Sequence, residues 1–562
     1  MHMRLRKKLV LSLALLVVLA AAGLLFGTAG FRPKPQSAEA ALMTEVKKLL
    51  ASDAQADDEF GFSVAVSGNI AVVGAFLEDA EGTNAGAAYL FKRDEGGADT
   101  WGELTKLTVG DADADDLFGI SVAIDGDIII VGANKEDAGG SGAGAAYIFE
   151  RDQGGPDSWG EVKKLTASDA DIADQFGRSV SVSGDTVLVG AWFEDSTAFN
   201  AGAAYVFQRN EGGADNWGEV NQLLASDGAN NDYFGWTVSV NGDTAIIGSY
   251  LNDEVDSDAG GAFVFQRDQG GADNWGQVIK LTASDAQADD YFGWSVSVSG
   301  DTAVVGALLE DAAADDAGAA YIFQRNEGGV DNWGEVKKLL ASDAETDDNF
   351  GIGVSVNGNT AVVGAYLEDA EGTNAGAAYL FERDEGGANN WGEFTKLLAS
   401  EAQADDNFGV SVGVSGDTIV GGAWFEDAGG DAAGAAYVFD LQHPKKLAEP
   451  GDTDGDGCSD QREFGPDETL GGRRSYKDPY DFYDVLGPGA ALPKDKIIDL
   501  PNDILGVIQH FAPLGTEPEY DVQFDRGPSA GPNPWNMTAP DGVIDLPNDI
   551  LGVIQQFAHS CQ

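Results

Sequence analysis

The chain has 562 residues, and its 94 Asp and Glu side chains outnumber 33 Lys and Arg, which gives a formal net charge of −61. This excess argues against a nucleic-acid-binding surface, because phosphate binding depends on Lys and Arg neutralising the backbone charge. It suits cations, basic partners or a salty exterior. Hydrophobic residues make up 43% of the chain, which is enough for packed cores, and the 76 glycines point to many tight turns. Together these features favour a β-rich protein.

The first 42 residues have the pattern of a targeting segment. Arg4, Arg6, Lys7 and Lys8 precede the apolar run Leu9–Phe26, and small residues follow it. The run also reaches the length at which a membrane-spanning helix can form. We therefore expect a secreted or cell-surface protein in which residues 1–42 act either as a cleaved signal peptide or as an N-terminal anchor.

The dipeptide Phe-Gly recurs along the chain at intervals of 58 residues. A Gly followed by a small residue, and then an aromatic residue, recur in phase with it. A fixed period of this length is the signature of a repeat architecture. The seven phenylalanines are Phe60, Phe118, Phe176, Phe234, Phe292, Phe350 and Phe408.

Each copy contains the pattern of four strands. In the fifth copy, Ser295–Ser299 alternates with period two, Gly300-Asp301 is a tight-hairpin signal, and Thr302–Ala307 is an apolar strand. Tyr321–Phe323 and Glu335–Leu340 are the third and fourth strands, with a Gly-Gly loop between them. Four antiparallel strands repeated radially describe a propeller blade. The sequence thus predicts an all-β, seven-bladed β-propeller over residues 43–441.

The fourth strand of the last blade must come from elsewhere in the chain. The Trp-Gly that opens this strand occurs six times, while Thr44–Leu50 lies one period before the strand that starts at Gly102. We expect this N-terminal strand to complete the seventh blade, because closure pairs two exposed strand edges at once. Lys445–Ala448 is a rival closing strand that lies out of phase.

Phe-Gly, then Val-Gly-Ala, then Gly-Ala-Ala-Tyr resembles the FG-GAP repeats that form the propeller of integrin α chains, over about residues 44–441. The resemblance implies a seven-bladed propeller with an adhesive role. The chain departs from the integrin pattern because the Pro of Gly-Ala-Pro is absent and the first hairpin is too short for the Asp-rich calcium loop of some integrin blades. These departures weaken the transfer of calcium binding to the ring.

Residues 44–440 contain no His or Cys, so the chemistry available to the ring is that of carboxylates. An acidic pair or its Asn-Asp equivalent follows each second strand, and an Asp precedes each Phe-Gly by two places. We expect both sets on one rim, because the loops after strands two and four emerge on the same face. The aspartates before Phe-Gly are Asp58, Asp116, Asp174, Asp232, Asp290, Asp348 and Asp406.

Two interpretations of these acids stay open. The first is structural: the aspartates cap turns and the other acids form a solvated face. The second is a multivalent surface for cations or basic ligands. Seven near-identical sites do not favour catalysis, because an enzyme normally breaks its symmetry at one site. Fixed-phase Trp and Tyr are interpreted as packing between blades, with sugar stacking as an alternative for Trp236 and Trp294, which follow Phe-Gly in two copies.

A twelve-residue calcium loop lies beyond the ring, between residues 452 and 463. Carboxylates occupy loop positions one, three, five, nine and twelve, a Gly allows the sharp turn at position six, and a backbone carbonyl serves position seven. The ligands we expect for Ca²⁺ are Asp452, Asp454, Asp456, the Cys458 carbonyl, Asp460 and Glu463. The chain has two cysteines, and pairing of Cys458 with Cys561 stays open.

A duplicated unit fills the C-terminal part of the chain. Ile498–Gln509 returns as Ile544–Gln555, and each copy has a Pro-started helix pattern. Residues 442–465 are expected to be a linker that carries the calcium loop, and residues 466–562 an α-helical module that resembles a dockerin. Secondary Ca²⁺ ligands on this resemblance are Asp495, Asp499, Asp541 and Asp545. In dockerins such a module binds a cohesin, so the resemblance implies a cohesin-like partner.

These patterns predict an exported, non-catalytic, calcium-binding propeller that mediates cell-surface adhesion or protein assembly. Its ligand would be an extracellular protein or a polysaccharide, and not a nucleic acid. The alternative is an extracellular carbohydrate-active enzyme or accessory protein carried by the dockerin-like tail. A third interpretation is a structural envelope component whose acidity is an adaptation to salt.

Overall fold

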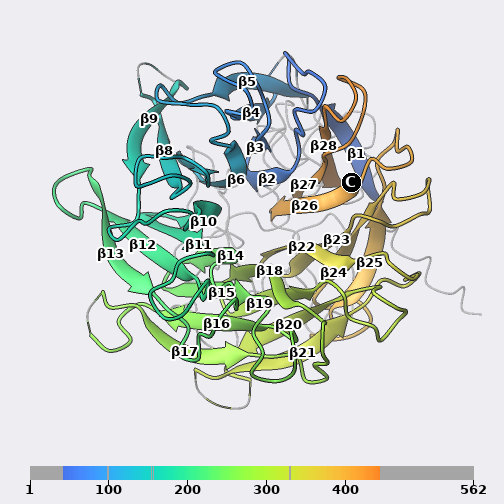
Figure 1. Ribbon diagram of the computed structural model, residues 1–562. Coiled ribbons are helices and arrows are strands. Elements are labelled where there is room, and N and C mark those ends of the chain that lie inside the picture. The colour runs from blue at the N-terminus through green and yellow to red at the C-terminus, as the bar shows by residue number, and fades with distance from the viewer. Residues whose placement is uncertain are drawn as a thin grey trace, which may run out of the picture. The chain divides into compact units, whose positions relative to one another are not determined.

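The computed structural model describes residues 42–442 except for the loop residues 96, 98, 99, 154, 156, 272, 328 and 330. This part of the chain forms seven four-stranded antiparallel sheets arranged as blades around a central axis (Figure 1). It contains no helix that is long and apolar enough to cross a membrane. The predicted all-β, seven-bladed propeller is confirmed, while the targeting segment 1–41 and the tail lie outside the described residues.

Each blade runs from an innermost to an outermost strand. The innermost strands are β2 (Ser63–Ser67), β6 (Phe118–Asp125), β10 (Phe176–Ser183), β14 (Thr237–Asn241), β18 (Phe292–Ser299), β22 (Phe350–Asn357) and β26 (Phe408–Ser415). The second strands are β3 (Ile70–Ala75), β7 (Ile128–Ala133), β11 (Thr186–Ala191), β15 (Thr244–Ser249), β19 (Thr302–Ala307), β23 (Thr360–Ala365) and β27 (Thr418–Ala423). The third strands are β4 (Ala87–Arg93), β8 (Ala145–Arg151), β12 (Ala203–Arg209), β16 (Gly261–Gln266), β20 (Ala319–Arg325), β24 (Ala377–Glu382) and β28 (Ala435–Gln442). The outermost strands are β5 (Trp101–Leu107), β9 (Trp159–Leu165), β13 (Trp217–Leu223), β17 (Gly276–Leu281), β21 (Trp333–Leu339), β25 (Gly392–Leu397) and β1 (Leu42–Leu49).

The ring is closed by its first strand. In the seventh blade the strand order is β1-β28-β27-β26, so the N-terminal strand lies beside the last one, as predicted (Figure 1). Leu49 is buried there, and the carboxylate of Glu45 accepts hydrogen bonds from the amide and hydroxyl of Ser400. The closure therefore ties the N-terminal strand to the last blade and pairs the edge of β28.

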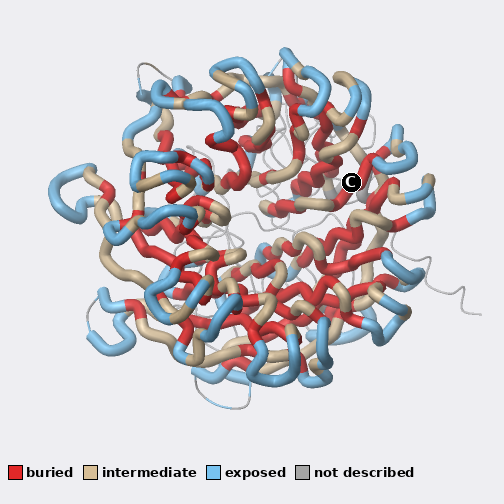
Figure 2. The backbone as a smooth tube through the Cα atoms, in the orientation of Figure 1, coloured by how far each residue is buried: buried red, intermediate tan, exposed pale blue. Residues whose placement is uncertain are grey.

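The cores lie between neighbouring blades. Second strands are buried along their whole length, except for Thr360 at the start of β23, because alternate side chains enter the cores on the two sides of the sheet. Val72 packs with the second blade and Val73 with the seventh. Phe60 sits in one such core with its ring centroid 5.5 Å from that of Tyr89. The outermost Trp101 is buried in the same core, which confirms the packing role of the fixed-phase aromatics. Burial is concentrated in the strands and exposure in the loops (Figure 2).

The Gly of Phe-Gly is required by the contact between blades. Gly119 has a φ of +97°, and a Cβ atom there would lie 2.2 Å from the carbonyl oxygen of Ala87 in the preceding blade. Next to it, Gly86 and Phe118 form a parallel bridge between blades. The repeated dipeptide thus places a large aromatic ring in the core and its own backbone against the neighbouring sheet.

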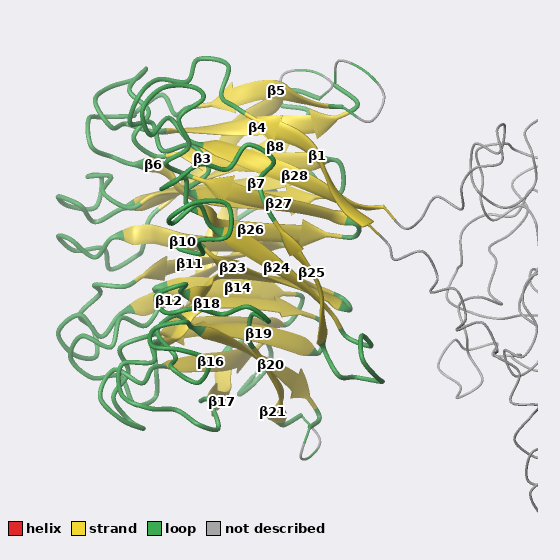
Figure 3. Ribbon diagram, turned by 90° about the vertical axis from the view of Figure 1, so that its right-hand side faces the viewer, coloured by secondary structure: helices red, strands yellow, loops and turns green. Residues whose placement is uncertain are grey.

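The loops divide between two faces of the ring (Figure 3). The loops that follow strands two and four lie together, since the amide of Phe118 donates to the carbonyl of Ala85 and the amide of Asp115 to that of Thr83. The opposite face carries two-residue hairpins such as Gly68-Asn69, in which Ser67 pairs with Ile70. The expected sharing of one face by both acid-bearing loops is confirmed.

Candidate functional site

The aspartates before Phe-Gly are buried in turns. Asp58 is 2% exposed, and its Oδ2 accepts a hydrogen bond from the amide of Gln55 at 2.7 Å. The same bond, from the amide three residues earlier, recurs in all seven copies. The acceptors in the other six copies are Asp116, Asp174, Asp232, Asp290, Asp348 and Asp406. These aspartates therefore do not form an exposed rim, and turn capping accounts for them.

Burial has an electrostatic consequence for these groups. It raises the pKa of Asp58 to about 6, and the nearby carboxylate of Glu78 adds to the rise. The pKa values of the equivalent groups shift in the same direction, to about 6 for Asp174, Asp290, Asp348 and Asp406. The described residues include no cluster of three or more His, Cys, Asp or Glu with the geometry of a metal site.

The glutamates after strand two are held by lysines. Lys106 Nζ lies 2.8 Å from Oε1 of the buried Glu78 and 2.8 Å from Oδ2 of Asp53, while the hydroxyl of Tyr89 donates to Asp53 at 2.7 Å. We call this set of four side chains the lysine clamp. It recurs around Lys164, Lys338 and Lys396, and in altered form around Lys48 and Lys280.

The third blade lacks this lysine. Gln222 takes its place, and the Nε2 group of Gln222 donates to Asp169 at 3.0 Å and to the Tyr205 hydroxyl at 3.1 Å. Glu194 is therefore buried without a lysine partner, and burial raises its pKa. A cavity of about 270 Å³ beside it is lined mainly by carboxylates, from Asp169, Asp171, Asp174, Glu194 and Asp195.

A second cavity, of about 360 Å³, lies on the ring axis and breaks the symmetry of the blades. We call it the axial cavity. Its wall is formed by the innermost strands where they begin, and by two aromatic residues that follow second strands, Tyr366 and Trp424. The residue after each Phe-Gly points into it, and these residues differ from blade to blade: Phe62, Ile120, Arg178, Trp236, Trp294, Ile352 and Val410.

Aromatic rings gather on two sides of the axial cavity. On one side Trp236 lies with its ring centroid 4.9 Å from Trp294 and 4.9 Å from Trp192. On the other side Phe62 lies 5.2 Å from Trp424. These rings are half-buried, so part of each remains open to a ligand.

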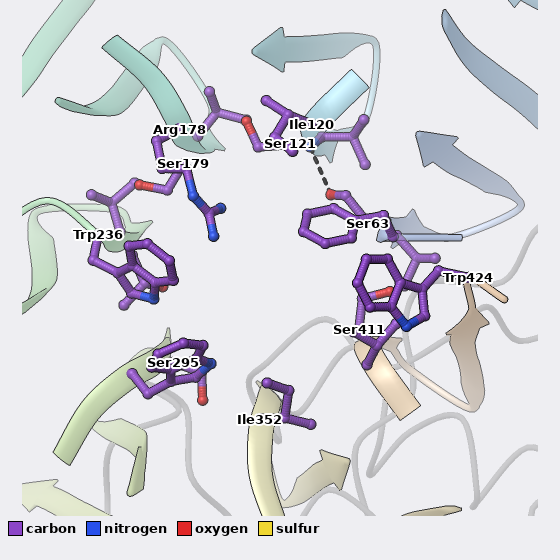
Figure 4. A pocket seen from close by; sticks show the side chains of 18 of the residues that line it. Ser63, Ile120, Ser121, Arg178, Ser179, Trp236, Ser295, Ile352, Ser411 and Trp424 are labelled. Atoms are coloured by element: carbon purple, nitrogen blue, oxygen red, sulfur yellow. Dashed lines mark hydrogen bonds between the residues drawn. The ribbon is translucent and has the colours of Figure 1, made fainter. Parts of the chain in front are cut away.

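Arg178 is the charged side chain of the axial cavity. Its guanidinium projects into the open space, with Cζ 4.0 Å from the ring centroid of Trp236 (Figure 4). Among the described residues, no Asp or Glu lines the cavity. Burial lowers the pKa of Arg178 to about 10, which leaves the group protonated at neutral pH.

A family comparison accounts for the periodicity of this architecture. The FG-GAP repeat matches residues 43–91, 101–149, 159–207, 217–265, 275–323, 333–381 and 391–439, which is more than half of the chain. The chain belongs to the FG-GAP repeat family. No curated protein matches the sequence. FG-GAP propellers share the fold of integrin α chains and are often calcium-binding and adhesive.

The predicted calcium ligands of this FG-GAP protein lie outside the described residues. They are Asp452, Asp454, Asp456, Cys458, Asp460 and Glu463 in the loop, and Asp495, Asp499, Asp541 and Asp545 in the dockerin-like module. The sites in the tail therefore stay predictions, and the pairing of Cys458 with Cys561 stays open.

Sequence reasoning did not single out Arg178, Tyr366 or Trp424 as parts of one site. The signal that could have found Arg178 is its departure from the FG-GAP pattern, because the other six copies carry an apolar residue at that place. Positions that are the same in all seven copies serve the fold of the blade. A binding site on the ring axis is therefore best sought at the positions where the copies differ.

Proposed function

We propose that this FG-GAP propeller is exported and non-catalytic, and that it mediates adhesion or protein assembly at the cell surface. The observation that carries the proposal is the contrast between its two kinds of site. The repeated acids are occupied in turn caps and lysine clamps, whereas the axial cavity is unsymmetrical, partly open and lined by aromatic rings. A binding protein can use the axial cavity, and it does not require a reactive group from the repeated acids.

We place the proposed calcium site in the tail. The loop between Asp452 and Glu463 has an oxygen ligand at each diagnostic place. In this proposal the loop binds Ca²⁺, and the dockerin-like module joins the propeller to a cohesin-like partner on another protein. The ring then presents its loop-rich face to a ligand, an extracellular protein or polysaccharide.

The test is retention on the producing cell's own envelope. The chain from residue 43 to residue 562 is fixed to a surface, and the binding of an envelope fraction is measured with calcium and with a chelator. We expect retention in calcium and its loss in chelator. The double variant Asp452→Ala and Glu463→Ala should lose the calcium response. Equal retention of an unrelated acidic protein would overturn the proposal.

A second candidate, a carbohydrate-active enzyme or accessory protein, is favoured by one observation: Trp236 and Trp294 line the axial cavity. Exposed aromatic faces suit the apolar faces of sugar rings. The two candidates differ in turnover. Release of new reducing ends from an envelope polysaccharide would support the enzyme, and retention without release would support an accessory or adhesive role.

A further inference from the structure

Arg178 occupies a position that is apolar in every other blade. The equivalent residues are Phe62, Ile120, Trp236, Trp294, Ile352 and Val410. Six apolar residues at this place show that the fold does not require a charge there. The presence of an arginine at this place is therefore not explained by the packing that all the blades share.

The guanidinium of Arg178 has no counterion within the described part of the chain. No hydrogen bond or ion pair joins it to a described residue, and its contact is with the face of Trp236. Five of the six other ring arginines pair with carboxylates: Arg151 lies 3.1 Å from Asp127, and Arg267 lies 3.2 Å from Asp243. The sixth, Arg383, donates to the hydroxyl of Thr302 at 2.6 Å. Arg178 differs from all six, because it has neither a carboxylate nor a hydroxyl partner among the described residues.

Nearby hydroxyl groups of the axial cavity are already used between blades. The Ser121 hydroxyl donates to the Gly177 carbonyl at 2.9 Å, Ser295 to Gly351 at 2.7 Å, and Ser411 to Gly61 at 2.8 Å. What the wall still offers to a ligand is therefore the guanidinium, the aromatic faces, and the polar edges of the aromatic side chains Trp236, Trp294 and Tyr366.

We propose that the axial cavity binds a sugar that carries a single carboxylate, a terminal uronic acid, with the carboxylate on Arg178 and the sugar ring against the neighbouring tryptophans. A guanidinium matches a carboxylate with two parallel N–H donors. A volume of about 360 Å³ lies in the lower range of small-ligand sites. The net charge of −61 disfavours a ligand with many negative charges. This inference rests on the proposed binding function and names its ligand class.

The test compares two matched probes on the chain from residue 43 to residue 562. Methyl β-glucuronide and methyl β-glucoside differ in a carboxylate and a hydroxymethyl group, and their dissociation constants are measured by ligand-observed NMR. We expect the glucuronide to bind about tenfold more tightly, a ratio that corresponds to one charge-assisted contact. The variant Arg178→Ile, which places in this blade the residue that two other blades carry, should reduce the ratio to about one.

Two controls keep the result interpretable. The melting temperature of Arg178→Ile shows whether the variant is folded, and Trp294→Ile, also a substitution found in other blades, should weaken both probes equally. N-acetyl-glutamate amide tests an acidic peptide group as the ligand. Arg178-dependent binding of that probe without binding of the glucuronide would overturn the inference, as would equal binding of the two sugars. Equal binding of the two sugars by the unsubstituted chain, together with calcium-dependent envelope retention, would overturn this inference while leaving the proposed adhesion intact.

Discussion

At the residue scale, the glycine of Phe-Gly is fixed by both its dihedral angle and its neighbour. Gly119 has a positive φ, and the Ala87 carbonyl oxygen stands 2.2 Å from where a Cβ would be. Gly126, in the adjacent hairpin, also has a positive φ, but a Cβ there would meet no atom within 4 Å. Substituting Ala at Gly119 and at Gly126 therefore distinguishes two destabilising effects, the strain of a positive φ and a clash between blades.

We expect Gly119→Ala to destabilise the fold by about 3 kcal/mol or more, because overpacking adds to the strain of a left-handed backbone. Gly126→Ala should cost about 1 kcal/mol, the strain alone. Urea unfolding followed by tryptophan fluorescence measures both. Similar losses for the two variants would contradict the role assigned to the contact between blades.

The buried aspartates give the fold a dependence on pH. The pKa of Asp58 is raised to about 6 in the folded chain and lies near 4 when unfolded, so the folded state holds the proton more tightly. The contribution of this proton is therefore present at low pH and is lost as pH rises through about 6. We expect the melting temperature to be higher at pH 5 than at pH 7.5.

The matched variant for this prediction is Asp58→Asn, which keeps the acceptor for the Gln55 amide and removes the charge. At pH 7.5 it should raise stability by about 1–3 kcal/mol, and at pH 5 the gain should shrink. Calorimetric melting at both values measures this. A loss of stability at pH 7.5 would show that the charged form is the one the turn requires.

At the scale of the element, the lysine clamp distinguishes one blade from the others. Lys338 lies 2.6 Å from Glu310 and 2.8 Å from Asp285, while the third blade carries Gln222 at this place. A buried carboxylate without its cation costs stability, since its lost hydration is not replaced. Introducing a lysine at this place in the third blade should therefore stabilise the fold.

Exchanging the two side chains tests this. We expect Gln222→Lys to raise the melting temperature, and Lys338→Gln to lower stability by about 1–3 kcal/mol. Differential scanning calorimetry of the two variants at pH 7.5 provides the comparison. If both lower the melting temperature equally, the lysine has no general role in the blades.

The positions of the strands could be predicted from the sequence better than the burial of the repeated carboxylates. Period-two alternation and the Gly-Asn or Gly-Asp hairpin located the inner strands, and Thr302–Ala307 agrees with β19. The third strand was predicted at Tyr321–Phe323 but extends over Ala319–Arg325, because small residues such as Ala319 and Ala320 carry little strand signal and are held by pairing with Gly306 and Ala307. Asp58 resembles a surface acid in sequence, and its burial follows from a turn that only the assembled blades enclose.

At the scale of the whole molecule, the fold depends on β1. Lys48 of that strand lies 2.7 Å from the buried Glu426, and Leu49 is buried in the core shared by the first and seventh blades. We expect a chain that begins at residue 51 to lose cooperative unfolding and to self-associate, because removal of β1 exposes an edge. A chain that begins at residue 42 is the control. Equal melting of the two in calorimetry would contradict closure by β1.

The site could be predicted from sequence only in part, since a ring axis is not visible in a linear repeat. Trp236 and Trp294 stand out by their spacing, but Trp424, much later in the chain, lines the same cavity only because the ring closes. The calcium loop in the tail is a local motif, so the sequence alone can predict it, and it lies outside the described residues.

The central claim is that this FG-GAP propeller binds an extracellular ligand without transforming it. The measurement that tests it most directly is incubation of the chain from residue 43 to residue 562 with the producing cell's envelope polysaccharide, followed by assay of bound material and of new reducing ends. We expect saturable binding and no increase in reducing ends over a protein-free control. A steady, protein-dependent release of reducing ends would contradict it.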